Sequence, residues 1–214
     1  MQAKINNLFT GKPKILTDIK KITSCIRKSN VNLLDVKKDH ISNDQCFDLK
    51  YHGGSDRVVH FYPSENYHAI LEEFPNLQYK QIQGRIGENI STEKLNEKNV
   101  SIGDIFSIGE TILEITEPRN PCSTIDVGFN QKGILKFVYQ SNRIGWFARV
   151  LKEGKISSTD TIDKIENPNP KFTIDYVFQK VVKEKGKDKD SISLINQLPQ
   201  LSKRYREDCH KILS

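Results

Sequence analysis

Short apolar segments separated by glycine turns, between Val100 and Thr116, constrain the fold of this chain more than any other feature. The turns are Gly103-Asp104 and Gly109-Glu110, and the segments around them are rich in isoleucine. Glycine reaches backbone conformations that other residues avoid, so it suits tight turns between strands. Short strands at this spacing are typical of a barrel or a strongly bent sheet. We therefore predict a mainly β fold of the α+β class, a β-barrel with short helices.

The hydrophobic periodicity changes at Asn167-Pro168-Asn169-Pro170, from that of strands to that of helices. Beyond this boundary we expect three short helices, the first capped by Thr173 and the third by Ser202. The predicted organisation is a barrel domain over residues 1–167 and a helical extension over residues 168–214. Because so short a segment holds little core of its own, the extension is expected to pack on the barrel or on another subunit.

Other segments carry local predictions. Residues 1–12 are polar and predict a loose lead-in, whereas Lys14 to Ile26 is rich in β-branched residues and predicts a strand or hairpin. A helix with an apolar face is expected from Tyr67 to Phe74, with Ser64 as its cap. A second short helix is predicted within Gln131 to Gln140.

The composition excludes some classes of protein. Hydrophobic residues make up 36% and charged residues 28% of the 214 residues. No apolar run reaches the length of about 18 residues that a membrane span needs, and Met1 to Lys14 does not resemble a secretory signal, so we expect a cytoplasmic protein without membrane attachment. The net charge of +6 is compatible with nucleic acid or with an anionic ligand. Because the lysines are scattered among acidic residues, a solvated surface is favoured and nucleic-acid binding is not expected.

Four cysteines, at positions 25, 46, 122 and 209, include no C-x-x-C pair. Their spacing argues against a zinc ribbon and against a disulfide framework, so free thiols are expected. His52, His60 and His68 are evenly spaced, but a spacing of eight is not a recognised metal-ligand geometry. We interpret His68, beside the apolar face of its helix, as structural.

Cys122 stands out because it ends the stretch Pro118-Arg119-Asn120-Pro121-Cys122. The two prolines stiffen this loop, and a neighbouring guanidinium favours the thiolate over the thiol. Such a cysteine suits a metal ligand or a nucleophile. The alternative is a small buried hydrophobic residue, which is the more frequent role of an isolated cysteine.

Two glycine-rich loops offer places for an anionic ligand. The first carries Gly53 and Gly54, flanked by Lys50, His52 and Arg57 as possible partners of a phosphate. The second, from Gly84 to Ser91, carries Asn89, whose amide can recognise the edge of a heterocycle. Ordinary turns between strands remain the alternative for both loops.

Taken together, these stretches resemble the MOSC family, named after the C-terminal domains of molybdenum cofactor sulfurases, and within it the bacterial YiiM-type branch. The resemblance rests on their order and approximate spacing from about residue 10 to residue 165. The matching pieces are Asp44-Gln45, Lys50-x-His52-Gly53-Gly54-x-Asp56-Arg57, Tyr62-Pro63 before a helix, Gly87-Glu88-Asn89-Ile90-Ser91, Gly103-Asp104, Pro118-Arg119-x-Pro121-Cys122 and Gly145-Trp146-x-x-Arg149-Val150. One departure is Asn43, where the family commonly has glycine; asparagine tolerates positive φ, so we expect the turn to survive.

The resemblance implies a molybdenum cofactor, a metal held by the dithiolene of a phosphate-bearing pterin (Mo-molybdopterin). Cys122 would be the catalytic residue that ligates molybdenum through its thiolate, in keeping with the preference of soft metals for thiolates. The resemblance implies a second set of residues that contact the phosphate, the pterin or the mouth of the site. These are Lys50, His52, Gly53, Gly54, Arg57, Glu88, Asn89, Ser91 and Arg119.

The implied activity is the reduction of small N-hydroxylated compounds, such as hydroxylaminopurine bases, to amines, a detoxification independent of pyridoxal phosphate. The sequence shows no flavin, haem or iron–sulfur signature, so electrons are expected from a separate reductase, a flavoprotein in type. The alternative function is a carrier of the cofactor or of sulfur, with a persulfide on Cys122. A basic nucleic-acid-binding barrel ranks lower, and an oligomer is compatible with the sequence.

Overall fold

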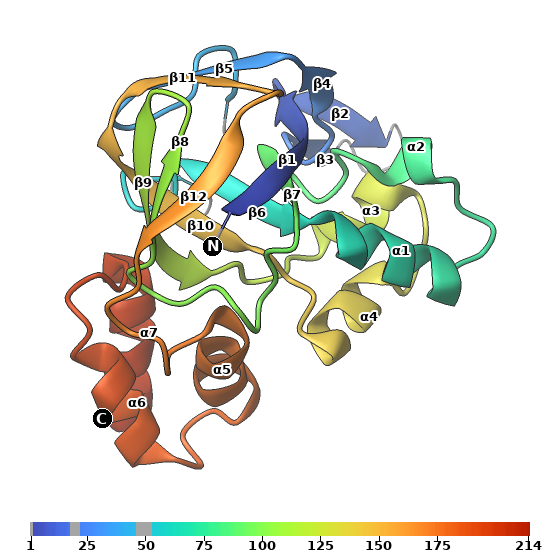
Figure 1. Cartoon of the computed structure of the whole chain (residues 1–214). Coiled ribbons are helices and arrows are strands. Elements are labelled where there is room, and N and C mark those ends of the chain that lie inside the picture. The colour runs from blue at the N-terminus through green and yellow to red at the C-terminus, as the bar shows by residue number, and fades with distance from the viewer. Residues whose placement is uncertain (1, 18–21, 46–52) are drawn as a thin grey trace.

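The computed structural model describes residues 2–17, 22–45 and 53–214, and within them seven strands close into a β-barrel. The strands follow one another around the barrel in the order β12-β8-β9-β10-β6-β7-β1, and β1 pairs with β12 to close it. The pair β6 and β7 is parallel, and the other neighbours around the barrel are antiparallel. Figure 1 shows this barrel as the upper part of the molecule. The predicted mainly β barrel of the α+β class is confirmed.

The bounds of the strands are β1 Gln2–Thr10, β2 Lys14–Thr17, β3 Ile22–Ser24, β4 Ser29–Val31, β5 Leu33–Val36, β6 Val59–Pro63, β7 Ile90–Glu93, β8 Ile105–Ile108, β9 Thr111–Pro118, β10 Trp146–Lys152, β11 Gly154–Ser157 and β12 Thr161–Glu166. The bounds of the helices are α1 Ser64–Glu73, α2 Tyr79–Ile82, α3 Thr124–Phe129, α4 Ile134–Ser141, α5 Ile174–Phe178, a π-helical turn η1 Gln179–Lys183, α6 Lys189–Asn196 and α7 Lys203–Leu213. Outside the barrel, β4 pairs with β1, while β2 with β3 and β5 with β11 form separate pairs.

The prediction of a loose lead-in over residues 1–12 is wrong. Residues 2–10 form β1, which pairs with β7, β12 and β4 and so completes the barrel. Ala3, Ile5, Leu8 and Phe9 are buried along it. Polar residues between them hid this strand, because a strand with one solvated face needs apolar residues at only part of its positions.

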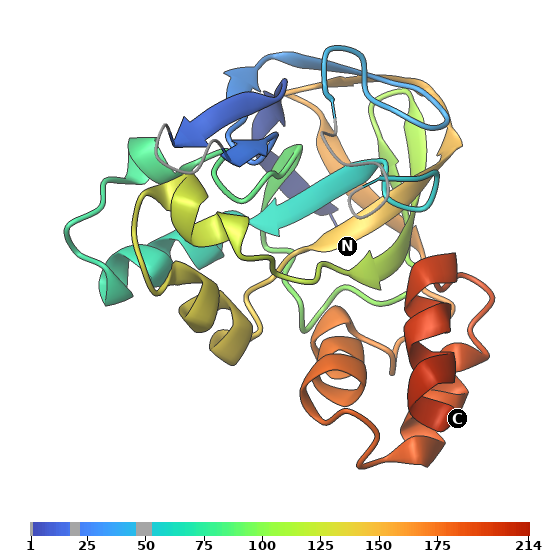
Figure 2. The same cartoon turned by 180° about the vertical axis from the view of Figure 1, so that it is seen from behind.

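The helices lie in two groups. Helices α1 to α4 flank one side of the barrel, and α5, α6 and α7 gather at one end of it, a division that the view from behind repeats (Figures 1 and 2). The three-helix extension predicted from the change of periodicity is therefore confirmed, with Thr173 and Ser202 as N-caps of α5 and α7. No helix within residues 2–17, 22–45 and 53–214 has the length and apolar character needed to cross a membrane.

The extension shares the core of the barrel. Phe178, Ile195 and Tyr205 belong to one cluster of buried side chains together with barrel residues such as Trp146. Backbone hydrogen bonds also join the two parts, from the Ile102 amide to the Phe172 carbonyl and from the Ile174 amide to the Val100 carbonyl. The division at residue 167 stays a prediction, because these contacts run across it without a gap.

Two helix predictions need correction. Ser64 does not cap α1: it is the first helical residue, and Pro63, extended at φ −60° and ψ 133°, occupies the cap position. Helix α3, directly after Cys122, was not expected, because Thr124–Phe129 contains a glycine and β-branched residues that disfavour a helix when considered alone. The helix predicted within Gln131 to Gln140 is present as α4, shifted slightly along the chain.

Candidate functional site

A cavity of about 400 Å³ opens at the side of the barrel, where several loops meet. Its wall includes the segment that follows β3, the loop before β6, the loop between α2 and β7, and the loop after β9. Its lining includes Lys28, Asp44, Arg57, His60, Asn89, Arg119, Cys122, Thr124 and Phe147.

The thiol of Cys122 faces this cavity from the loop between β9 and α3. Its Sγ lies 2.8 Å from Oγ1 of Thr124, and its carbonyl accepts a hydrogen bond from the Ile125 amide. Burial raises the pKa of Cys122, but the charge of Arg119 and the hydrogen bond from Thr124 outweigh it, so the pKa lies below the ordinary thiol value. The site therefore holds a thiol that deprotonates readily, as a metal ligand or nucleophile must.

Pairing of neighbouring strands builds the floor of the cavity. Phe147 on β10 lies opposite His60 on β6 and opposite Glu117 on β9. Residues directly opposite on adjacent strands project to the same side of a sheet, so these three side chains form a row. The rings of His60 and Phe147 lie 4.8 Å apart between centroids, and the guanidinium carbon of Arg57 lies 4.4 Å from the Phe147 centroid.

Two buried polar groups in the cavity wall lack partners. Nη1 of Arg119 and Nε2 of His60 form no hydrogen bond with any described residue, and both side chains are buried. Burial and the charge of Arg119 hold the pKa of His60 well below its usual value, so this imidazole is neutral at pH 7. A buried polar group without a partner costs free energy, and a ligand that forms a hydrogen bond with it removes that cost.

The arginine of the first glycine loop is held from behind. Nε of Arg57 lies 2.8 Å from Oε1 of Glu117, and the two side chains are 7% and 2% exposed. At the neighbouring Gly54, φ is +105° and an added Cβ would meet no atom within 4 Å. Bare backbone and a fixed guanidinium thus lie together at this wall, an arrangement suited to a phosphate.

The opposite wall is organised around Asp44. Its carboxylate accepts hydrogen bonds from the Gly11 amide at 2.8 Å, from Nζ of Lys28 at 2.7 Å and from Nδ2 of Asn89 at 2.9 Å. Asn43, just before it, has φ 64°, which confirms that asparagine supports the turn where the family has glycine. Breaking a pair as buried as Lys28 and Asp44 costs about 3 to 5 kcal/mol, so this pair stabilises the wall.

The structure brings six of the ten predicted site residues to the cavity: Gly53, Gly54, Arg57, Asn89, Arg119 and Cys122. Lys50 and His52 lie outside the described residues. Glu88 and Ser91 do not line the cavity. Ser91 is fully buried within β7, and the Glu88 carboxylate accepts hydrogen bonds from the Gly84 and Ile86 amides at 2.6 and 3.1 Å and from the Tyr67 hydroxyl. Glu88 thus shapes the loop that carries Asn89, because its carboxylate accepts hydrogen bonds from the backbone of that loop.

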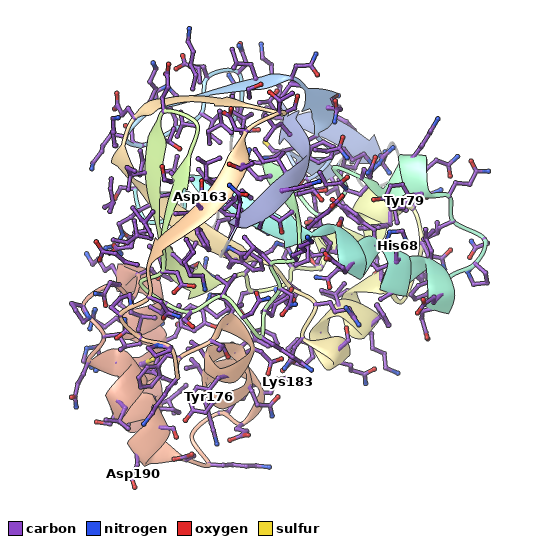
Figure 3. The ribbon with its side chains drawn as sticks, in the orientation of Figure 1. His68, Tyr79, Asp163, Tyr176, Lys183 and Asp190 are labelled. Atoms are coloured by element: carbon purple, nitrogen blue, oxygen red, sulfur yellow. The ribbon has the colours of Figure 1, made fainter. Side chains whose placement is uncertain are left out.

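Several residues that line the cavity were not predicted as site residues, among them Cys25, Lys28, His60, Thr124 and Phe147. No local sequence pattern marks His60 or Lys28. The pairing of β6 with β10 places His60, and the contact with Asp44 places Lys28. Thr124 could have been suspected from its place two residues after Cys122. Among the evenly spaced histidines, His68 stays away from the cavity lining and stacks on Tyr79 at 5.1 Å, as Figure 3 shows on α1.

The residues present fit an anionic cofactor that carries a soft metal. A thiolate-forming cysteine supplies the soft ligand, and the basic groups of Arg119, Arg57 and Lys28 lie around it, the last two paired with Glu117 and Asp44. The unpartnered Nη1 of Arg119 and Nε2 of His60 offer hydrogen bonds to a ligand, and Gly54 lets it approach the backbone.

Comparisons with known proteins identify the class of protein. Residues 48–163 match the model of the MOSC domain family. The chain is 31% identical over 160 residues to Protein YiiM of Escherichia coli (strain K12), covering 74% of this chain and 70% of that protein. It is 36% identical over 149 residues to a protein named Reductase of Gibberella moniliformis, covering 69% of this chain but only 26% of that protein. The chain therefore belongs to the MOSC domain family.

Solved structures assign the branch. The crystal structure of YiiM from Geobacillus stearothermophilus superposes with a TM-score of 0.83 at 27% identity, covering 99% of this chain and all 100% of that one. YiiM from Escherichia coli shares the fold with a TM-score of 0.80 at 24% identity, covering 100% of this chain and 92% of that one. The likeness includes the helical extension, and the chain is of the YiiM type.

Proposed function

We propose that this chain binds a molybdenum cofactor and reduces small N-hydroxylated compounds to amines. The observation that carries the proposal is the cavity in which the Cys122 thiol, its pKa lowered, lies among Arg119, Arg57 and Lys28. Membership of the MOSC family and the name Reductase of one relative support an oxidoreductase bound to this cofactor. When bound, the cofactor would supply the two electrons that, with two protons, convert an N-hydroxyl group to an amine and water.

The side chains would then have separate tasks. Cys122 would ligate the metal, with Thr124 and Arg119 holding the thiol in its anionic form. Arg57 and Lys28 would neutralise the phosphate of the pterin, and bare backbone at Gly54 would let it approach. His60, neutral at pH 7, would offer a hydrogen bond to the pterin or substrate without adding charge.

We propose that the electron donor is a separate reductase that is a flavoprotein. Cys122 would serve as a ligand and not as an electron store, and the relative named Reductase is much longer than the part that this chain matches. Activity measured with an added flavoprotein reductase, compared with activity of the chain alone with a chemical reductant, would show whether turnover depends on the reductase.

Metal and pterin analysis tests the cofactor. The chain purified from a host that makes the cofactor should contain molybdenum and pterin in equal amounts, close to one of each per chain. Cys122→Ser should lose molybdenum and reduction of a hydroxylamine substrate by at least about a hundredfold, because a hydroxyl is a poor ligand for a soft metal. Cys209→Ser, at a buried thiol outside the cavity, is the matched control and should keep both. Absence of molybdenum and pterin from the wild-type chain, or full turnover by Cys122→Ser, would contradict the proposal.

A carrier of sulfur is the second candidate, since the same easily ionised thiol could hold a persulfide. Treatment of the purified chain with cyanide separates the two functions. Thiocyanate released from Cys122 in the absence of bound molybdenum would favour the carrier, whereas metal without releasable sulfur would favour the reductase.

A further inference from the structure

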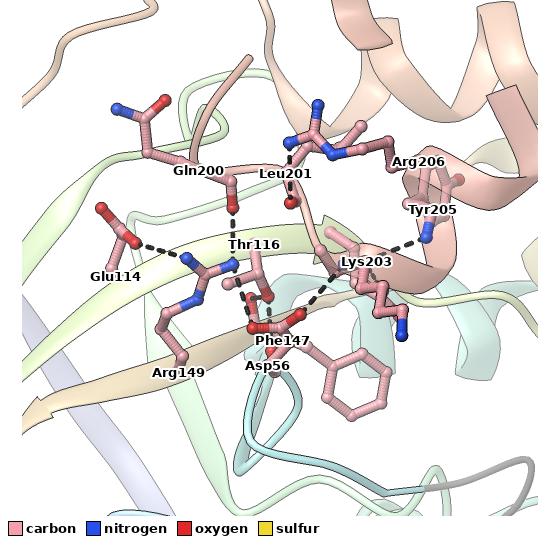
Figure 4. Close-up of polar contacts among 12 residues, drawn as sticks. Asp56, Glu114, Thr116, Phe147, Arg149, Gln200, Leu201, Lys203, Tyr205 and Arg206 are labelled. Atoms are coloured by element: carbon pink, nitrogen blue, oxygen red, sulfur yellow. Dashed lines mark hydrogen bonds and ion pairs between the residues drawn. The ribbon is translucent and has the colours of Figure 1, made fainter. Parts of the chain in front are cut away.

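The start of α7 touches the barrel directly behind the first glycine loop. Figure 4 shows Asp56 of this loop close to Lys203 at the start of α7, to Thr116 of β9 and to Arg149 of β10. Asp56 and Arg57 are adjacent, and Arg57 lines the cavity. The extension and the cavity wall are therefore joined through two consecutive residues.

Asp56 forms one of the two connections. Its Oδ2 accepts a hydrogen bond from the Lys203 backbone amide at 3.0 Å, and its Oδ1 lies 3.1 Å from Nη2 of Arg149. The same Nη2 donates to the carbonyl of Gln200, in the loop between α6 and α7, at 2.9 Å. The Asp56 carbonyl accepts from Thr116 at 2.6 Å. The backbone next to Arg57 is thus fixed from the side of the extension.

Glu117 forms the other connection. One carboxylate oxygen pairs with Nε of Arg57 at 2.8 Å, and the other accepts a hydrogen bond from the hydroxyl of Ser202, the N-cap of α7. Glu117 and Ser202 are buried, and burial raises the pKa of Glu117, opposed by Arg57 and Ser202. The carboxylate would lose one of its stabilising partners if α7 moved away.

We propose that the extension positions Arg57 for its ligand: Ser202 holds Glu117, which pairs with the Arg57 side chain, and the Lys203 amide holds Asp56, the residue directly before Arg57 in the cavity wall. The inference rests on the proposed function, since it takes Arg57 as a partner of the cofactor phosphate. Asp56, Glu117, Ser202 and Lys203 act through Arg57 and are positioning residues.

The coupling is reciprocal. If docking of α7 raises the affinity of the cavity for an anion, an anion in the cavity stabilises docking of α7 by the same factor. An anion bound to Arg57 should therefore slow hydrogen exchange of amides in α7, although α7 does not line the cavity. A merely structural role of the extension does not produce this effect.

Two substitutions at one position isolate the Lys203 amide. Lys203 is the first residue of α7, where proline is well accommodated, and Ser202 before it has φ −59° and ψ 150°, the extended geometry that proline requires of its predecessor. Lys203→Pro deletes the amide donor to Asp56 and keeps the helix. Lys203→Ala removes the same exposed side chain and keeps the amide, so it is the matched control.

Ser202→Ala tests the second connection by deleting the hydroxyl that Glu117 accepts. Because this substitution also removes a helix cap, Thr173→Ala is its control: Thr173 caps α5 through the Tyr176 amide and makes no contact with Glu117. Urea unfolding of each variant shows that it remains folded at the temperature of the assay.

The assay is protection of Cys122 from iodoacetamide by inorganic phosphate, at constant ionic strength, in chain free of cofactor. Peptide mass spectrometry follows Cys122 alone. Lys203→Pro and Ser202→Ala should each need about threefold to tenfold more phosphate for half protection, an effect of the size of one ordinary hydrogen bond. Lys203→Ala and Thr173→Ala should protect like the wild-type chain. Phosphate should slow hydrogen exchange of α7 in the wild-type chain and not in Lys203→Pro.

Equal protection of Lys203→Pro and Lys203→Ala, with Ser202→Ala also unchanged, would overturn the positioning role and leave the proposed function intact. Failure of phosphate to protect Cys122 in the wild-type chain would instead contradict the anion site itself, and with it both the proposed function and this inference.

Discussion

At the scale of single residues, Cys122 owes its chemistry to two neighbours. Burial alone would raise the pKa of its thiol, but Arg119 and Thr124 reverse the direction. Cys209 shows the contrast: burial and the negative charge of Asp208 raise its pKa to about 11, and the charge of Arg206 only partly opposes them. We therefore expect the Cys122 thiol to react more readily than the Cys209 thiol.

The pH dependence of alkylation follows from this difference. The rate at Cys122 should rise with pH and level off below the pH expected of an ordinary thiol, because a lowered pKa gives thiolate at lower pH. Arg119→Gln should move the midpoint upward and slow alkylation at pH 7 by about threefold or more, since the thiolate fraction falls. Peptide-resolved labelling over pH 5 to 10 measures both profiles, with Cys209 as the unreactive reference. An unchanged midpoint in Arg119→Gln would show that its charge does not act on the thiol.

At the scale of elements, the turn at Asn43 and the loop at Glu88 hold the walls of the cavity. Asn43 has a left-handed backbone and directs Asp44 toward Lys28 and Asn89. Glu88 satisfies two amides of its own loop. Each turn or loop is fixed by contacts between residues close in sequence, and each positions a side chain, Asp44 or Asn89, that lines the cavity.

The turn makes one prediction. Asn43→Gly should change the free energy of unfolding by less than about 1 kcal/mol, because glycine adopts this backbone conformation freely. Asn43→Val should destabilise the chain by about 1 to 2 kcal/mol, the cost of a left-handed backbone for a residue with a bulky Cβ. Urea unfolding of the two variants provides the comparison, and equal stabilities would mean that the turn rearranges.

The loop at Glu88 allows a second prediction. Glu88→Ala should lower the free energy of unfolding by about 2 to 4 kcal/mol, because the buried Gly84 and Ile86 amides lose their acceptor. Glu73→Ala, at an exposed position near the end of α1, should change it by less than about 0.5 kcal/mol. Chemical unfolding of the two variants decides the matter; a small effect at Glu88 would indicate that water replaces the carboxylate.

At the scale of the whole molecule, the barrel and the extension share one core and a set of buried polar contacts. We therefore expect them to unfold together. Trp146, fully buried in β10, reports the barrel by fluorescence, and circular dichroism reports chiefly the helices. The two urea transitions should coincide, as a single cooperative unit requires. A helical signal that is lost before the tryptophan signal would show an extension that melts separately.

Much of this architecture follows from local patterns. Glycine turns between Val100 and Thr116 predicted a barrel, the change of period near residue 167 predicted three helices, and proline, arginine and cysteine in one short stretch singled out Cys122. Strand β1 escaped because its burial depends on partners far along the chain. Periodicity registers local regularity, whereas burial is decided by what packs against a segment.

The sequence by itself determined the fold class, the helical extension and the loop that carries Cys122, because propensity, turn chemistry and the proline ring act between near neighbours. Only the tertiary structure decided that His60 and Phe147 lie opposite each other on paired strands and that Lys28 forms an ion pair with Asp44. It also decided that Glu117 contacts both Ser202 and Arg57. Such contacts join residues far apart in the chain, and the closure of the barrel brings them together.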